Sequence, residues 1–318
     1  MKKSFWIIGI VVVLALVAVR IGSSNKPSDY VVKIGYLPIT ASQLPLEIAQ
    51  QKKFFEDQGI TVQATQLQTS NQIVDALARG DIDLTPEISI LPYLNAEMVD
   101  PGKMKIIALT DITSDVPFDS LLVKENSTIK TLEDLKGKKI GVFPGTSASN
   151  MFKLFLKEKG IDSSTIQFVQ LPPPQHLTAL TAGSIDALFT YEPTISIALT
   201  SGGIRKIYGS VYSEQLEHSP LGVALVSTQF VNNHPREAKK VVNAFDRAFD
   251  YLHTNDKDVR DMTRTLFKLD QKVVDVLGMT YFRNSQQIDK TLVAKLLDIL
   301  VASGEFTSKP DLTNAYYK

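Results

Sequence analysis

The chain contains the sequence KIGYLP at Lys33–Pro38 and the related sequence KIGVFP at Lys139–Pro144. A second motif follows each copy: ALARGDID at Ala76–Asp83 and ALTAGSID at Ala179–Asp186, with Ala, Leu, Gly, Ile and Asp in the same places. The two copies are too far apart for a solenoid, whose units repeat at about 20–50 residues. We therefore expect two similar lobes. Matched loops of two facing lobes make a cleft, where a functional site is expected.

The composition indicates a globular protein of balanced charge. Of 318 residues, 44% are hydrophobic, and 34 Lys and Arg balance 34 Asp and Glu. No excess of positive charge indicates a nucleic-acid partner. The length allows two domains of ordinary size. Cysteine is absent, which excludes disulfides, thiol catalysis, cysteine-based metal sites and the acylated cysteine of a bacterial lipoprotein.

Residues 1–24 have the pattern of an export signal. Lys2 and Lys3 precede an apolar run, Phe5–Val19, which is followed by Arg20 and small residues. The run suits a signal peptide and falls short of the roughly 20 residues that span a bilayer comfortably. We favour a cleaved signal peptide and keep an uncleaved membrane anchor as the alternative. These place the body in the periplasm or at the outer face of the inner membrane.

Strand and helix patterns alternate along both copies. In the first copy we expect a helix at Leu44–Glu56 and a buried strand at Ile82–Thr85, and the second copy repeats the order. This order predicts an α/β fold of two similar lobes with mostly parallel sheets. From Val231 to its end the chain is predicted to be almost wholly helical.

The domain boundaries follow from the same pattern. Asp111–Leu122 is a candidate crossover between the lobes, and Leu221–Ser227 is the natural return strand. We expect residues 30–113 and 222–318 to form a discontinuous first lobe, and residues 114–221 to form the second.

Candidate ligand contacts lie in the loops that follow the strands. Ligands of open α/β sheets bind beyond the carboxyl ends of the strands, often against helix N-termini. The alternative for the hydroxyl residues is an ordinary helix N-cap, and for the tyrosines it is core packing. The candidates are Tyr36, Thr40, Ser42, Gln43, Gln68, Thr69, Glu87, Thr146, Ser147, Ser149, Tyr191 and Glu192.

Two of these candidates are glutamates that follow buried strands, in Pro86-Glu87 and Glu192-Pro193. Carboxyl groups in a cleft can act as general acid and base, or hold an amine or the N–H edge of a heterocycle. Alternatively, each caps the helix that it opens. None of the candidate loops contains the Lys or Arg that anion sites usually recruit. This favours an amine-bearing or heterocyclic ligand over a sulfonate.

The sequence lacks the motifs of common enzymes and metal sites. It contains no H-E-x-x-H, G-x-S-x-G or P-loop pattern, and no His, Asp and Glu cluster has metal-ligand spacing. Of four histidines, only His176 falls in a candidate loop. We therefore expect no catalytic residue, no metal and no cofactor.

Several motifs resemble those of the solute-binding proteins of ABC importers. The chain is most similar to the group that includes binders of sulfonates, taurine, nitrate and thiamine-pyrimidine precursors. The resemblance covers residues 31–209. Besides the Ala76–Asp83 motif, the motifs are GYLP at Gly35–Pro38, FFEDQGITV at Phe54–Val62, LEDLKGKKIG at Leu132–Gly141 and ALFTYEP at Ala187–Pro193.

The resemblance implies a type II periplasmic-binding-protein architecture, in which two lobes close on a small molecule without catalysis. The ligand would pass to a membrane permease driven by a separate ATPase. We expect a monomer that meets the membrane only through its N-terminal segment. Two alternatives stay open. One is the ligand-sensing subunit of a membrane signalling system. The other is an enzyme similar to a pyrimidine synthase, whose activity is associated with a cysteine-rich motif that this chain lacks.

Overall fold

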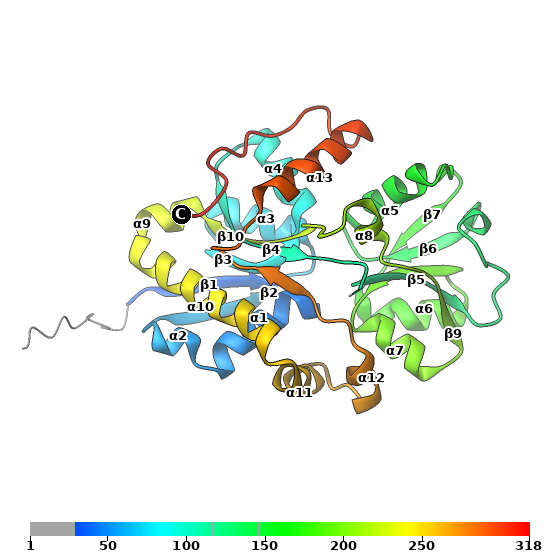
Figure 1. Cartoon of the computed structure of the whole chain (residues 1–318), viewed down its shortest axis with the longest axis horizontal. Coiled ribbons are helices and arrows are strands. Elements are labelled where there is room, and N and C mark those ends of the chain that lie inside the picture. Colours follow the sequence, from blue (N-terminus) through cyan, green and yellow to red (C-terminus); the bar gives the residue numbers. More distant parts are fainter. Residues whose placement is uncertain (1–28, 116–117, 146) are drawn as a thin grey trace, which may run out of the picture.

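The computed structural model describes residues 29–115, 118–145 and 147–318. The predicted leader, residues 1–24, and the candidate ligand residue Thr146 lie outside these ranges. Within them, no helix combines the length and the apolar character needed to cross a membrane. The described chain forms two lobes, each built on one sheet with helices on both faces (Figure 1).

The first sheet has six strands and takes them from both ends of the chain. β1 runs parallel to β2 and β3, whereas β10 pairs antiparallel with β3 and β4, and β11 pairs antiparallel with β4. The spatial order is β11 (Tyr281–Arg283), β4 (Met104–Asp111), β10 (Gly222–Ser227), β3 (Leu84–Ser89), β1 (Val31–Tyr36) and β2 (Thr61–Gln66).

The second sheet has five strands. β6 runs parallel to β7 and β8, and β5 pairs antiparallel with β8 and β9. Both sheets are therefore mixed, and the predicted parallel order is found within each repeat only. The antiparallel neighbours β5 and β10 are the strands by which the chain enters a sheet from the other lobe. The order is β7 (Gln167–Gln170), β6 (Lys139–Val142), β8 (Ala187–Tyr191), β5 (Asp119–Lys124) and β9 (Ile204–Gly209).

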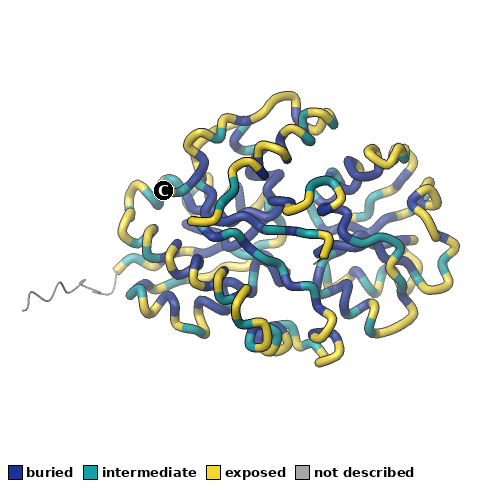
Figure 2. The backbone as a smooth tube through the Cα atoms, in the orientation of Figure 1, coloured by how far each residue is buried: buried dark blue, intermediate teal, exposed yellow. Residues whose placement is uncertain are grey.

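Helices cover both sheets, and the buried residues concentrate in the strands between them (Figure 2). Two short 3-10 turns, Glu133–Leu135 and Pro173–Gln175, lie in the second lobe. The helices before β5 and after β10 are α1 (Thr40–Gln51), α2 (Phe54–Asp57), α3 (Ser70–Arg79), α4 (Ile90–Val99), α9 (Thr228–Asn233), α10 (Pro235–Thr254), α11 (Asp256–Phe267), α12 (Gln271–Val276) and α13 (Lys290–Ala302). Those between are α5 (Ser147–Glu158), α6 (His176–Ala182), α7 (Thr194–Ser201) and α8 (Val211–Gln215).

The two repeated motifs of each lobe are hydrogen-bonded to one another. In the first lobe Lys33 N donates to Asp83 Oδ2, and Asp83 N donates to Lys33 O, both at 2.8 Å. Lys139 and Asp186 repeat both bonds in the second lobe, again at 2.8 Å. These aspartates therefore hold the first strand of each repeat beside the third.

The glycine of each KIG motif leaves room for an isoleucine of the second motif. A Cβ atom on Gly35 would lie 2.5 Å from Ile82 Cδ1, and one on Gly141 would lie 2.5 Å from Ile185 Cδ1. Real Cβ atoms do not approach other atoms so closely, so the strand and the isoleucine pack together only because the side chain is absent.

Three predicted elements differ from the observed ones. The helix expected at Leu44–Glu56 is two helices, because Lys53 adopts a left-handed conformation with φ of 60° between α1 and α2. The strand expected to end at Thr85 continues to Ser89. The tail is not wholly helical, since β11 adds an edge strand to the first sheet. Strand β9 was not predicted from the sequence.

The lobes are joined by the segment between β4 and β5 and by the segment between β9 and β10. These two segments pair at an Ile112–Ser219 bridge. The tail also touches the second lobe, where α12 packs against α7. On the α5 side, Lys157 Nζ donates to Ser303 O at 2.5 Å. All strands of the second sheet lie in residues 114–221. The domain boundaries at 113/114 and 221/222 stay a prediction.

We predict that Gly141→Ala lowers the free energy of unfolding by about 1–3 kcal/mol, the usual range for overpacking a dense core. Ile185→Val removes the methyl group that the new Cβ would meet and should cost about 0.5–1.5 kcal/mol alone. In the double variant the two losses should not add, because the second change relieves the first. Urea unfolding of the four proteins measures this, and simple additivity would contradict the packing argument.

Candidate functional site

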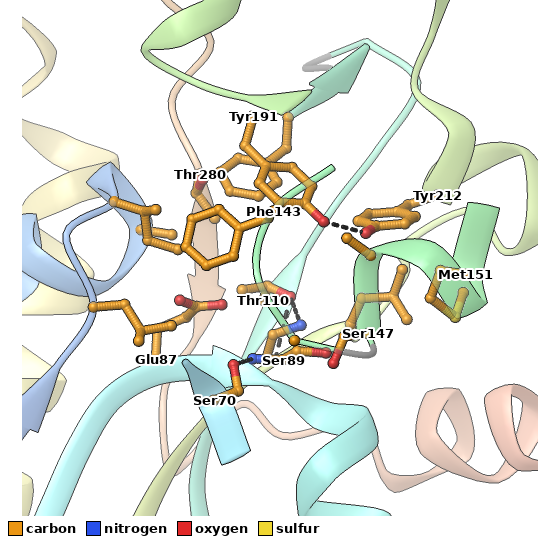
Figure 3. Close-up of a pocket in the computed structure, with 18 of the residues that line it drawn as sticks. Ser70, Glu87, Ser89, Thr110, Phe143, Ser147, Met151, Tyr191, Tyr212 and Thr280 are labelled. Carbon is orange, nitrogen blue, oxygen red and sulfur yellow. Dashed lines mark hydrogen bonds between the residues drawn. The ribbon is translucent and has the colours of Figure 1, made fainter. Parts of the chain in front are cut away.

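One pocket, here called the interlobe pocket, lies between the two sheets and is lined by residues of both lobes (Figure 3). Its volume is about 60 Å³. By a comparable measure one water needs about 10–15 Å³, so the pocket fits a small molecule. Its polar lining residues are Ser70, Asn71, Glu87, Ser89, Thr110, Ser147, Tyr191, Tyr212 and Thr280.

The pocket lies beyond the carboxyl ends of the parallel strands, where an open α/β sheet binds its ligands. The loop after β1 contributes Leu37 and Ile39, and the equivalent loop after β6 contributes Phe143, Pro144 and Gly145. These are the exit loops of the two KIG motifs, so the repeats meet at one cavity as the sequence predicted.

Glu87 brings a carboxyl group into the pocket from strand β3 (Figure 3). The residue is only 5% exposed. Its Oε2 atom has no hydrogen-bond partner in the part of the chain that the structure describes. Burial raises the pKa of this carboxyl to about 8. Glu87 therefore does not open a helix, as one sequence interpretation had it, but sits within a strand and faces the cavity.

Gly222 and Thr110 shape the space around Glu87. A Cβ atom on Gly222 would lie 2.7 Å from Glu87 Oε1 and 2.3 Å from Thr110 Cγ2. Thr110 Oγ1 accepts from Gly222 N at 2.7 Å and donates to Gly222 O at 3.2 Å. The close approach of β10 thus requires glycine, and it confines the carboxyl group.

Several helices begin at the pocket. Ser70 and Asn71 open α3, Ser89 precedes α4, and Ser147 and Ala148 open α5. The first N–H groups of a helix lack partners within the helix, and the helix dipole favours an acceptor or an anion there. Ser70 Oγ accepts from Ser89 N at 3.1 Å, which joins two of these helix starts. This side of the pocket suits a hydrogen-bond acceptor.

Aromatic rings of the second lobe form the opposite wall. Tyr191 stacks on Phe118, with ring centroids 5.2 Å apart and 15° between the planes. The hydroxyl groups of Tyr191 and Tyr212 are 2.6 Å apart and hydrogen-bonded. Phe143 completes the wall, and its ring centroid lies 6.0 Å from that of Tyr191. Flat apolar faces of this kind bind apolar groups and also cations.

Asp119 lies behind this wall and holds the backbone next to Tyr212 in place. Its Oδ2 accepts from Val211 N at 2.7 Å, which orients the turn that carries Tyr212. The residue is fully buried, and burial raises the pKa of its carboxyl to about 7. Asp119 does not line the interlobe pocket as the structure describes it.

Three of the twelve predicted ligand residues line the pocket: Glu87, Ser147 and Tyr191. Ser42 lies just behind it, where its Oγ accepts from Leu37 N at 3.0 Å and donates to Glu87 O at 2.8 Å. Ser42 therefore positions the backbone of Glu87.

The structure places most other candidates away from the lining. Thr69 is the N-cap of α3, and its Oγ1 accepts from Gln72 N at 3.2 Å. A ligand contact by the others stays a prediction. Of these, Tyr36 and Gln43 are half-buried, Gln68 is exposed and Thr40 and Ser149 are buried.

Glu192 joins the two lobes instead of lining the pocket. Its carboxyl accepts from Ser196 N at 3.1 Å and Ser196 Oγ at 2.9 Å within the second lobe. It also accepts from Gly278 N of the tail at 3.4 Å, and its backbone oxygen accepts from Thr40 Oγ1 at 3.4 Å. Burial raises the pKa of this carboxyl to about 7. The helix-cap alternative fits these contacts best.

The sequence did not indicate several of the lining residues. Ser70 and Asn71 open α3, directly after the chosen candidates Gln68 and Thr69. Thr110 and Tyr212 lie beside the crossovers, and Thr280 lies in the tail. No local motif marks these three, because only the tertiary fold brings them to the cavity.

In the part of the chain that the structure describes, the pocket offers one carboxyl group and several hydroxyl groups. Among its described lining residues there is no histidine, lysine or arginine. His176 is buried in the core of the second lobe, where its ring nitrogens contact Thr190 Oγ1 and Leu171 O. Across the described ranges, no group of three His, Asp or Glu side chains could hold a metal ion.

Known proteins resemble the chain along most of its length. A putative aliphatic sulfonates-binding protein of Bacillus subtilis (strain 168) is 28% identical over 283 residues, covering 86% of this chain and 81% of that protein. The alkanesulfonate-binding protein SsuA of Xanthomonas axonopodis pv. citri, solved bound to MOPS, matches with a TM-score of 0.74 and 20% identity over 92% of this chain and 99% of that one. The desulfurization enzyme DSZB also shares the fold, with a TM-score of 0.63 and 14% identity over 90% of this chain and 96% of that one.

The match to a family extends from the first lobe into the tail. The model of the NMT1-like family matches residues 25–266, which is most of the chain. The observed architecture of two α/β lobes is that of periplasmic binding proteins, as the similarity to SsuA shows. The resemblance found in the sequence is thus confirmed, and the chain belongs to the NMT1-like family.

Proposed function

We propose that the protein is the extracytoplasmic solute-binding component of an ABC importer. It closes two lobes on a small polar molecule and delivers this molecule to a membrane permease driven by a separate ATPase. The observation that carries the proposal is the interlobe pocket, whose lining comes from both lobes. A ligand that touches both lobes stabilises the closed arrangement relative to the open one, which is how such a protein signals occupancy.

Two further observations support a carrier over an enzyme. The described lining offers one carboxyl group and hydroxyl groups, without a histidine or lysine to act as a base beside a nucleophile. The relative from Bacillus subtilis is named as a binding protein. The pattern of residues 1–24 places the body in the periplasm, or at the outer face of the inner membrane if the segment remains as an anchor.

We predict that the exported protein binds a compound from a panel of amines, pyrimidines, amino acids, sulfonates and nitrate. Binding to the folded state alone adds about 2.7 kcal/mol of apparent stability at a hundredfold excess over Kd, which a thermal melt detects. Ala148→Leu, which puts bulk into the interlobe pocket, should weaken the binding at least tenfold. Ala182→Leu, at an exposed position of α6, is the matched control. The intact mass of the purified protein also shows whether residues 1–24 are removed.

If no compound of the panel shifts the melting temperature of the wild-type protein, the result would count against a solute carrier. Equal binding by Ala148→Leu and the control would place the site elsewhere.

We also predict that Glu87 makes the protein less stable as the pH rises. The folded state keeps the carboxyl proton up to a pKa of about 8, whereas the unfolded chain loses it near pH 4.5. Between these values the unfolded state binds fewer protons, so the free energy of unfolding falls with pH. The advantage of Glu87→Gln over wild type should therefore grow by about 1.4 kcal/mol per pH unit between pH 5 and 8.

Urea unfolding in ligand-free buffer at each pH measures this difference. The exposed Glu125→Gln is the control and should leave the difference flat. A flat difference for Glu87→Gln as well would show that the carboxyl is not buried in the free protein.

A further inference from the structure

The interlobe pocket has an unusual distribution of charge for a site that faces several helix N-termini. Glu87 is the ionisable acid among its described lining residues, and no basic side chain lines it. The titratable groups that face Glu87 from the second lobe are Tyr191 and Tyr212, with Asp119 behind them. Burial raises the pKa of both tyrosines, so their hydroxyl groups stay neutral.

The carboxyl of Glu87 lacks a compensating contact within the described chain. Its Oε2 is buried without a hydrogen-bond partner. A buried polar group without a partner is destabilising, and an unpaired buried charge is much more so. The neighbouring residues do not supply the partner, because Thr110 is bonded to the backbone of Gly222. In its ionised form the carboxyl of Glu87 needs a hydrogen-bond donor, and a cation satisfies it best.

We propose that Glu87 receives an ammonium group of the ligand, so that the cargo is a small amine-bearing molecule. This inference rests on the proposed carrier function and names the chemical class of its cargo. The aromatic wall supports it, because the rings of Phe143 and Tyr191 line the other side of the cavity, and aromatic rings attract cations.

The N-termini of α3 and α5 would bind the other end of the ligand. They face the same cavity with N–H groups and with the hydroxyl groups of Ser70 and Ser147. An acceptor at the other end of the ligand binds there. A sulfonate without an amine would satisfy these donors but would offer no hydrogen-bond donor to the ionised carboxyl of Glu87.

Binding of an ammonium group is coupled to loss of one proton. In the free pocket near pH 7 the carboxyl is mainly protonated, because burial raises its pKa to about 8. The ammonium group stabilises the carboxylate, and the carboxyl proton leaves to the solvent. Affinity for an amine that stays charged should therefore rise about tenfold per pH unit up to about pH 8 and then level off.

The test compares ethylamine and taurine, whose ammonium groups carry N–H donors, with ethanesulfonate and nitrate, which carry none. The titrations use the exported protein in weak phosphate at pH 7, and a pH electrode follows proton release. We expect the wild-type protein to bind ammonium probes at least tenfold more tightly than the anions, with up to one proton released per ligand.

Variants separate recognition from folding. Glu87→Gln should weaken the ammonium probes at least tenfold and abolish proton release, and Glu87→Asp should restore part of both. Glu97→Gln is the matched control, because Glu97 is also a buried carboxyl but contacts Gly102 N at the far end of α4. It should leave the affinities unchanged.

Three outcomes are informative. Tight binding of ammonium probes that depends on Glu87 supports the inference. Binding of ethanesulfonate or nitrate alone, unchanged in Glu87→Gln, would overturn the amine inference and leave the carrier function intact. A wild-type protein that binds none of these probes and none of the wider panel would overturn both.

Discussion

One aspartate in each lobe holds two strands in register, and the position of the pocket depends on it. Asp83 binds the backbone of Lys33 with both its amide and its carboxylate, and Asp186 binds Lys139 in the same way. This fixes the start of the first strand beside the start of the third. The strands then end at matching levels, so that their exit loops reach the same cavity. Because both lobes contain this aspartate–lysine contact, the same sequence pattern places an exit loop on each side of the pocket.

The sequence predicted those parts of the fold that short motifs determine. The KIG strands and the glycine-isoleucine-aspartate turns contact each other directly, so their local pattern is enough to identify two lobes. For the same reason, the sequence indicated that the loops after the two KIG strands meet at one cavity. The expectation of mostly parallel sheets missed the antiparallel direction of β5 and β10, because a strand that enters from the other lobe carries no local mark of its direction.

The site was harder to predict because its walls come from distant segments. Pro86 suggested a loop, yet β3 continues through Glu87, since β10 pairs with it as far as Ser89. Glu192 follows the corresponding strand but bonds to Ser196 and the tail. The two glutamates thus occupy similar places in the sequence and differ in role. Only the position of the tail, which no motif marks, separates them.

The polar contacts between the lobes are weak, which suits the lobe opening that the proposed carrier function requires. Those around Glu192 are 3.4 Å long, at the outer limit of hydrogen bonding. On the α5 side the shorter contacts, such as Asn150 Nδ2 to Glu305 Oε1 at 2.6 Å, are exposed, and exposed polar pairs contribute about 0–1 kcal/mol.

A ligand can contribute much to the stability of the closed arrangement, because Oε2 of the Glu87 carboxyl is buried between the lobes without a hydrogen-bond partner among the described residues. Satisfying a buried polar group recovers about 1–3 kcal/mol, and more for a charged one. That gain is made only when both lobes surround the ligand. It therefore counts as differential affinity for the closed state, which is the quantity that shifts a two-state equilibrium. A destabilising carboxyl in the pocket is thus the means by which occupancy can control closure.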